Sequence, residues 1–147
     1  MTAATGTGYS GVSQLATGIK YRAWGALKTL TNGDVSEKAN FALGYDSRLR
    51  LTRFDGGGRV TEHDYYADGR VRAVRDFTYG NFDRSYTYDH VGRLSSASAG
   101  TSPQWQQNPY SFTYSYDVWG NTTARSGTHW SQRADFTASY ANNRNTQ

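Results

Sequence analysis

Apolar and polar side chains alternate along much of this chain, in short runs that end at glycine, asparagine or aspartate. The clearest alternating runs cover residues 41–45 and 112–116, and a weaker one covers residues 136–140. A period of two places successive side chains on opposite faces of a strand. The pattern therefore predicts short strands with one buried face, joined by turns.

The composition favours the same fold class. The chain has 147 residues with 16 glycines and 12 tyrosines, and Glu37 and Glu62 are its only glutamates. Threonine, tyrosine and serine suit strands and turns, whereas the residues that fill helices at low cost are scarce. We expect an all-β chain.

A seven-residue motif recurs, with tyrosine first, glycine fifth and an apolar residue last. The clearest copy is YDHVGRL at residues 88–94, and copies with substitutions begin at Tyr21, Tyr65 and Tyr116. Degenerate copies begin at Tyr45 and Tyr140, where Leu49 and Arg144 replace the glycine. The six tyrosines are separated by 24, 20, 23, 28 and 24 residues, which indicates a repeat architecture.

Each copy of the motif predicts the tip of a β-hairpin. The glycine supplies a positive φ, and the aspartate accepts hydrogen bonds from backbone N–H groups of its own turn. Return turns are expected at Asn32 and Gly33, at Gly80 and Asn81, within residues 54–60 (a further copy of the motif) and within residues 100–108. The result is an antiparallel meander of about twelve strands of roughly five to six residues. We assign structural roles to Tyr21, Gly25, Tyr45, Asp46, Tyr65, Gly69, Tyr88, Asp89, Gly92, Arg93, Tyr116, Asp117, Gly120 and Tyr140.

The organisation along the chain is a flexible Gly/Thr/Ser-rich lead-in at residues 1–18, followed by six repeats at residues 19–147. Repeat arrays end in capping units, and no cap is evident, so we expect a fragment of a longer array. Open strands are expected near residues 19–21 and 136–140, and they favour association. We expect proline at Ala138 to block one mode of this pairing.

The motif Tyr-Asp-x-x-Gly-Arg-Leu at intervals of about twenty residues resembles the YD repeat, also called the RHS repeat. The resemblance implies a curved or spiral sheet strip. In bacterial RHS polymorphic toxins and insecticidal toxin complexes, such a strip is similar to a hollow shell around a toxic C-terminal segment. In teneurins a similar shell lies outside the cell and serves adhesion. The resemblance thus implies a structural, non-enzymatic module of a larger secreted or cell-surface protein, with other repeats and an enclosed toxin segment as partners.

Charge and composition exclude several alternatives. The chain has no cysteine, so it has no disulfide framework. Its net charge is +4, but arginines alternate with acids and form no basic stripe, so we expect no nucleic-acid partner. No apolar run approaches the ~20 residues of a membrane-spanning helix, and residues 1–18 lack the features of a signal peptide.

Motifs that carry chemistry are weak. Residues 6–11 spell G-x-G-x-x-G without the strand and helix of a dinucleotide site, so we expect no cofactor. His63, His90 and His129 lie too far apart in sequence to predict a metal site, and no nucleophile–base set predicts catalysis.

Aromatic residues leave one alternative open. Stacking on a sugar ring or on a partner, or covering of the apolar face of the sheet, are both compatible with Trp24, Trp105, Trp119 and Trp130. The alternatives to a shell are therefore an extracellular carbohydrate- or protein-binding module and a self-assembling β fibre.

Overall fold

The structure is a computed structural model that describes residues 3–5, 14–33, 38–79, 82–100, 110–130 and 132–146. Its regular elements are β-strands, and these residues form no α-helix, which confirms the all-β prediction. The chain divides into two compact units, Met1–His63 and Asp64–Gln147.

The first unit is a run of antiparallel strands: β1 (Ala4–Thr5), β2 (Gln14–Tyr21), β3 (Leu27–Asn32), β4 (Ala39–Tyr45), β5 (Leu51–Gly56) and β6 (Arg59–Tyr65), whose end extends past the unit boundary. Each strand pairs with the next one in sequence. Residues 14–18, which the sequence analysis assigned to the flexible lead-in, belong to β2.

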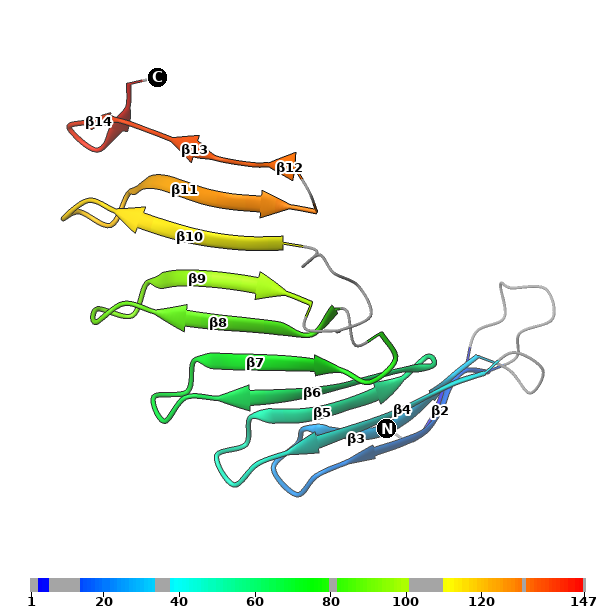
Figure 1. The fold of residues 1–147 in the computed structure, drawn as a ribbon. Coiled ribbons are helices and arrows are strands. Elements are labelled where there is room, and N and C mark those ends of the chain that lie inside the picture. Colours follow the sequence, from blue (N-terminus) through cyan, green and yellow to red (C-terminus); the bar gives the residue numbers. More distant parts are fainter. Residues whose placement is uncertain are drawn as a thin grey trace. The chain divides into compact units, whose positions relative to one another are not determined.

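The second unit continues the pattern (Figure 1) with β7 (Val71–Asp76), β8 (Arg84–Tyr88), β9 (Leu94–Ala99), β10 (Tyr110–Tyr116), β11 (Thr122–His129), β12 (Gln132–Arg133), β13 (Phe136–Thr137), β14 (Tyr140–Ala141) and β15 (Arg144–Asn145). Strands β7 to β11 pair in sequence order, β12 and β13 both pair with β11, and β14 pairs with β15. The predicted antiparallel meander is therefore confirmed within each unit, with several two-residue strands that the sequence did not predict.

The two faces of the second unit differ sharply. Tyr86 and Phe112 both lie opposite Ala97, which is only 6% exposed, so large rings flank a small residue. On the other face hydroxyl groups meet, and the Oγ atoms of Ser85 and Ser98 are 2.7 Å apart. Because successive strand residues alternate between the faces, this separation follows directly from the sequence pattern.

The apolar core is thin. Among the described residues, the buried hydrophobic side chains are Val74, Ala97, Ala99 and Ala138. Small side chains bury little apolar area, and stabilisation by burial scales with that area. Contacts between neighbouring hairpins therefore have an unusually large share in holding these strands together.

The return turns differ from the motif. The turn between β5 and β6 has two residues, Gly57 and Gly58, with φ of 60° and 79°, and Gly56 pairs with Arg59. The interpretation of residues 54–60 as a further copy of the motif is thus wrong, because the chain reverses in two residues and not in three. Strand β3 ends at Asn32, and Gly33 has φ of 92°. The turns expected at Gly80 and Asn81 and within residues 101–108 lie outside the described residues.

Candidate functional site

The motif residues build the hairpin tips, and the tip at residues 88–94 has the consensus geometry. Asp89 N donates to Arg93 O at 2.8 Å, and Gly92 N donates to Asp89 O at 3.0 Å. This leaves a three-residue loop whose last residue, Gly92, has φ of 92°. Gly25, Gly69 and Gly120 have φ of 91°, 96° and 90° at the same position, which is the predicted conformation.

The aspartate carboxylate organises this loop. Asp89 Oδ1 accepts the backbone N–H groups of Val91 and Arg93 at 3.1 and 2.9 Å, and Asp89 Oδ2 accepts Arg93 Nε at 2.7 Å. Asp117 accepts the N–H groups of Trp119 and Asn121 in the same way. The recurring aspartate therefore has the turn-forming role that the sequence indicated, with its oxygens occupied by its own loop.

These hydrogen bonds favour the ionised carboxylates. The backbone N–H of Arg50 holds the pKa of Asp46 below its usual value, assisted by the Arg50 side chain. The Arg70 side chain lowers the pKa of Asp68 to about 2. Donors to a charged group stabilise its charged form, so these tips are built for the ionised state.

Motif tyrosines connect each tip to the preceding one. In the second unit Tyr88 Oη donates to Val71 O at 3.1 Å, and Tyr116 Oη donates to Leu94 O at 2.8 Å. In the first unit Tyr45 Oη donates to Leu27 O at 2.9 Å. Every acceptor is the sixth residue after the preceding motif tyrosine, where the outgoing strand begins.

The last tip continues this series, since Tyr140 Oη donates to Thr122 O at 3.3 Å. We call these tyrosine-to-carbonyl contacts the tyrosine ladder; its donors are Tyr45, Tyr88, Tyr116 and Tyr140.

Arginines add a second connection, in the opposite direction along the chain. The guanidinium of Arg93 stacks on the Tyr116 ring, with its carbon 4.7 Å from the ring centre, and its Nη1 donates to Asp117 O at 2.9 Å. Arg70 stacks on the Tyr88 ring at the same distance. A guanidinium on an aromatic face is attracted by the ring quadrupole. Each of these arginines thus binds the next tip as well as its own.

Departures from the consensus have local solutions. Leu49 occupies the glycine position with φ of 65°, and Leu49 N still donates to Asp46 O at 3.0 Å. In the tip at residues 65–71, Tyr66 replaces the aspartate, and Asp68 instead accepts the backbone N–H of Arg70 at 3.0 Å.

The copy at Tyr140 departs further. Ala141 pairs with Arg144, and Asn142 and Asn143, with φ of 50° and 61°, form a two-residue turn. Two residues with positive φ define a type I′ turn. Asparagine tolerates this conformation better than other non-glycine residues, so the hairpin survives the loss of the glycine with a shorter loop.

The four tryptophans have different surroundings. Trp24 is 47% exposed and packs edge-on against Tyr45 of the next tip, with ring centres 6.0 Å apart. Trp119, at the equivalent position, is 78% exposed. Trp130 is 50% exposed and follows β11, with φ of 54°. Trp105 lies outside the described residues. The motif position therefore does not by itself decide whether an indole packs.

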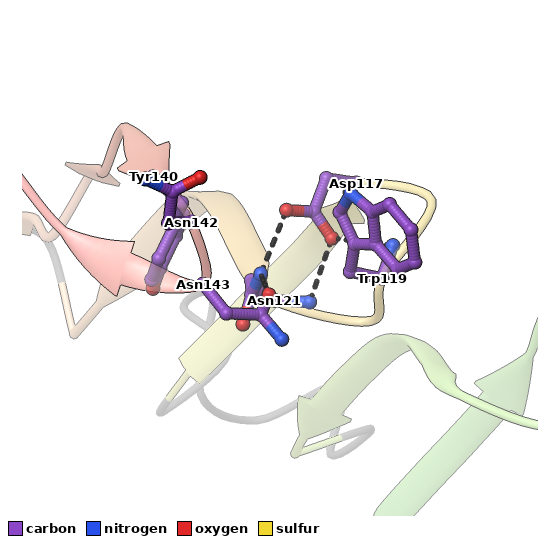
Figure 2. A pocket seen from close by; sticks show the side chains of 6 residues that line it. All are labelled: Asp117, Trp119, Asn121, Tyr140, Asn142 and Asn143. Atoms are coloured by element: carbon purple, nitrogen blue, oxygen red, sulfur yellow. Dashed lines mark hydrogen bonds between the residues drawn. The ribbon is translucent and has the colours of Figure 1, made fainter.

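Beside Trp119 lies a hollow of about 370 Å³ between the last two tips. Figure 2 shows its lining side chains, which are Asp117, Trp119, Asn121, Tyr140, Asn142 and Asn143. Asn121 Nδ2 donates to Asp117 Oδ2 at 2.8 Å and to Asn143 Oδ1 at 2.7 Å, so one amide joins both tips. The hollow has an aromatic wall and an amide rim, and its one carboxylate is occupied by the turn.

Sequence reasoning found the motif residues but not what several of them contact. It assigned no role to Asp68, Arg70, Asn121 or Asn143, each of which takes part in a tip contact. The available signal was the residue after the motif glycine, which is Arg70, Arg93 or Asn121 in three tips and is a hydrogen-bond donor each time.

Two searches over the described part of the chain found no site. No helix there is long and apolar enough to cross a membrane. Nor do those residues contain a group of three or more His, Cys, Asp and Glu side chains placed to hold a metal ion.

In comparisons with known proteins, the chain matches no protein-family model and no curated protein. The resemblance to YD repeats accordingly rests on the motif residues.

Proposed function

We propose that this chain is a structural module of YD-type repeats, and that its sheet forms part of a wall that encloses a toxin or another C-terminal effector. A wall must resist local opening, and here the tips are where resistance is concentrated. The module has no catalytic role in this proposal, and its main partners are neighbouring repeats.

The observation that supports the proposal is where the motif side chains are directed. Tyr116 and Arg93 spend their polar groups on the adjacent tip, and Asp89 spends its carboxylate on its own loop. Catalytic or ligand-binding groups have to be available to a substrate, whereas groups in a repeat array stabilise neighbouring units. Residues that recur at every repeat and contact the next repeat are those that a continuous wall requires.

The test uses the longer polypeptide of which we propose this chain to be a part. Arg93→Ala combined with Tyr116→Phe removes two inter-tip contacts, and Tyr114→Phe is the control, because no described residue bonds the Tyr114 hydroxyl. Limited proteolysis should cleave the enclosed segment faster in the double variant than in the parent or the control. Equal cleavage in all three proteins, or rapid cleavage in the parent, would contradict enclosure.

A second candidate function, carbohydrate binding, is favoured by the hollow beside Trp119. An exposed indole stacks on the C–H face of a sugar, and amides such as those of Asn142 and Asn143 bond its hydroxyls. The absence of a free carboxylate in the lining favours a neutral sugar over a cationic ligand.

Glycan-array binding of the parent and Trp119→Ala tests this second function. The control is Trp24→Ala, because Trp24 has the same motif position but packs on Tyr45. Loss of a neutral-glycan signal in Trp119→Ala alone would support the site. No binding by the parent, or equal binding by Trp119→Ala, would exclude it.

A further inference from the structure

One motif tyrosine stands outside the tyrosine ladder. Tyr45, Tyr88, Tyr116 and Tyr140 are half-buried and donate to a carbonyl of the preceding tip. Tyr21 has the same place in its motif, but it is 50% exposed, and its hydroxyl has no hydrogen-bond partner among the described residues. It is a ladder donor without an acceptor.

The strand that carries Tyr21 has an incompletely covered edge. On the side of β2 away from β3, β1 pairs only with the start of the strand, through Ala4 with Ala16 and Thr5 with Gln14. Within the part of the chain that the structure describes, residues 17–21 have no strand on that side. Unpaired N–H and C=O groups of an edge strand are a template for another strand.

The complementary group lies in the last hairpin. Ladder acceptors are the sixth residues after a motif tyrosine, as Leu27, Leu94 and Thr122 show. The sixth residue after Tyr140 is Thr146. Its N–H and hydroxyl both donate to Ser139 O, at 2.9 and 3.0 Å, which holds the residue in place. No described residue donates to the Thr146 carbonyl.

We propose that two copies of this chain associate head to tail, with the Tyr21 hydroxyl of one copy donating to the Thr146 carbonyl of the other. The free edge of β2 then pairs with β15 of the second copy, in the antiparallel manner of each consecutive pair within the units. The occupant is specified by continuity, because the same contact joins consecutive tips within each unit. A head-to-tail contact between unlike surfaces leaves both outer ends available, so association continues beyond the dimer.

The proposal depends on the ladder contacts and not on enclosure, so it is tested on the 147-residue chain alone. Sedimentation velocity over a concentration series would compare the parent with Tyr21→Phe and with Tyr88→Phe. Tyr21→Phe removes only the intermolecular donor and should weaken association roughly three- to tenfold, the usual range for one net hydrogen bond.

Tyr88→Phe is the matched control, because it removes the same hydroxyl from an intramolecular contact. It should lower the denaturant midpoint and leave association unchanged, whereas Tyr21→Phe should do the reverse. A monomeric parent at every concentration, unchanged association in Tyr21→Phe, or equal weakening in both variants would overturn the proposal.

A mixing experiment distinguishes head-to-tail from symmetric pairing. Thr146→Pro removes the N–H that holds the last hairpin and so damages the tail, while Tyr21→Phe damages the head. Each variant alone should associate weakly. An equimolar mixture should form dimers with nearly parental affinity, because one intact head meets one intact tail, and growth should stop there. If the mixture associates no better than the separate variants, head-to-tail pairing is wrong.

Discussion

The tips at residues 45–51 and 88–94 form the same loop from different residues. In both, an aspartate accepts two backbone N–H groups, and the arginine four residues later bonds the other carboxylate oxygen at 2.7 Å. They differ at the left-handed position, where Leu49 has φ of 65° and Gly92 has φ of 92°. The hydrogen-bond network therefore specifies the loop, and glycine is one of two residues that fill it.

The reason for the difference lies in what covers each tip. A Cβ on Gly92 would lie 3.0 Å from Nη1 of Arg70, the residue that stacks on Tyr88. Leu49 is 53% exposed, so its side chain extends into open space. A left-handed leucine costs about 1–2 kcal/mol in backbone strain. The comparison shows that glycine is required where an arginine of the preceding tip passes closely, and only favoured elsewhere.

The largest effect is expected from Gly92→Val. A β-branched residue at this φ is strained, and its side chain displaces Arg70, so we expect unfolding free energy to fall by about 2–3 kcal/mol. Urea denaturation measures the change. Gly120→Val is the matched control, because Gly120 has φ of 90° but no atom within 4 Å of its Cβ position. Its loss should be smaller, and equal losses would show that the Arg70 contact is unimportant.

Loss of a ladder hydroxyl should cost the two tips equally. Tyr45→Phe and Tyr88→Phe each remove one hydrogen bond to a backbone carbonyl, so each should lower the unfolding free energy by about 1 kcal/mol. Tyr114→Phe, on β10, should change nothing, because no described residue bonds its hydroxyl. Unequal losses at Tyr45 and Tyr88 in urea denaturation would mean that the tips are not equivalent.

Leu49→Gly should stabilise the chain. Relief of the left-handed strain exceeds the added backbone entropy of glycine in the unfolded chain, and we expect a gain of about 0.5–1 kcal/mol. Thermal unfolding with the same scan rate for both proteins checks the sign. A lower midpoint for Leu49→Gly would show that the leucine side chain has a stabilising contact that outweighs its strain.

Acid should weaken both tips modestly. Asp46, Asp89 and Asp68 have pKa values lowered by hydrogen bonds, that of Asp68 to about 2. The unfolded chain therefore binds more protons in this range, so its contribution to stability is complete above about pH 5 and is lost as pH falls toward 2. Urea midpoints at pH 7 and pH 3 measure it. Asp89→Asn should reduce the difference, and an unchanged pH dependence would exclude this carboxylate as a source.

One sequence-based expectation fails for a structural reason. Proline at Ala138 was expected to block pairing at an open edge near residues 136–140. Instead β13 pairs with β11, and Ala138 N donates to Thr123 O at 2.9 Å in a buried position. Proline there would remove an internal hydrogen bond and destabilise the second unit. Two-residue strands such as β13 carry too little periodicity for their pairing to be predicted.

Local chemistry was legible in the sequence because its causes lie within a few residues. Alternation along 112–116 determined which side chains share a face, and Asp89 with Gly92 determined the loop, since both act on their own turn. Contacts between tips had no such local signal. Arg70 reaches Tyr88, and Tyr116 reaches Leu94, only because pairing of the strands brings residues about twenty positions apart together. Likewise, Trp24 packs on a neighbouring ring while Trp119 stays exposed at the same motif position. The sequence by itself thus determined the hairpins and their faces. Their mutual attachment was decided by tertiary structure, because a side chain's partner depends on which tip lies beside it.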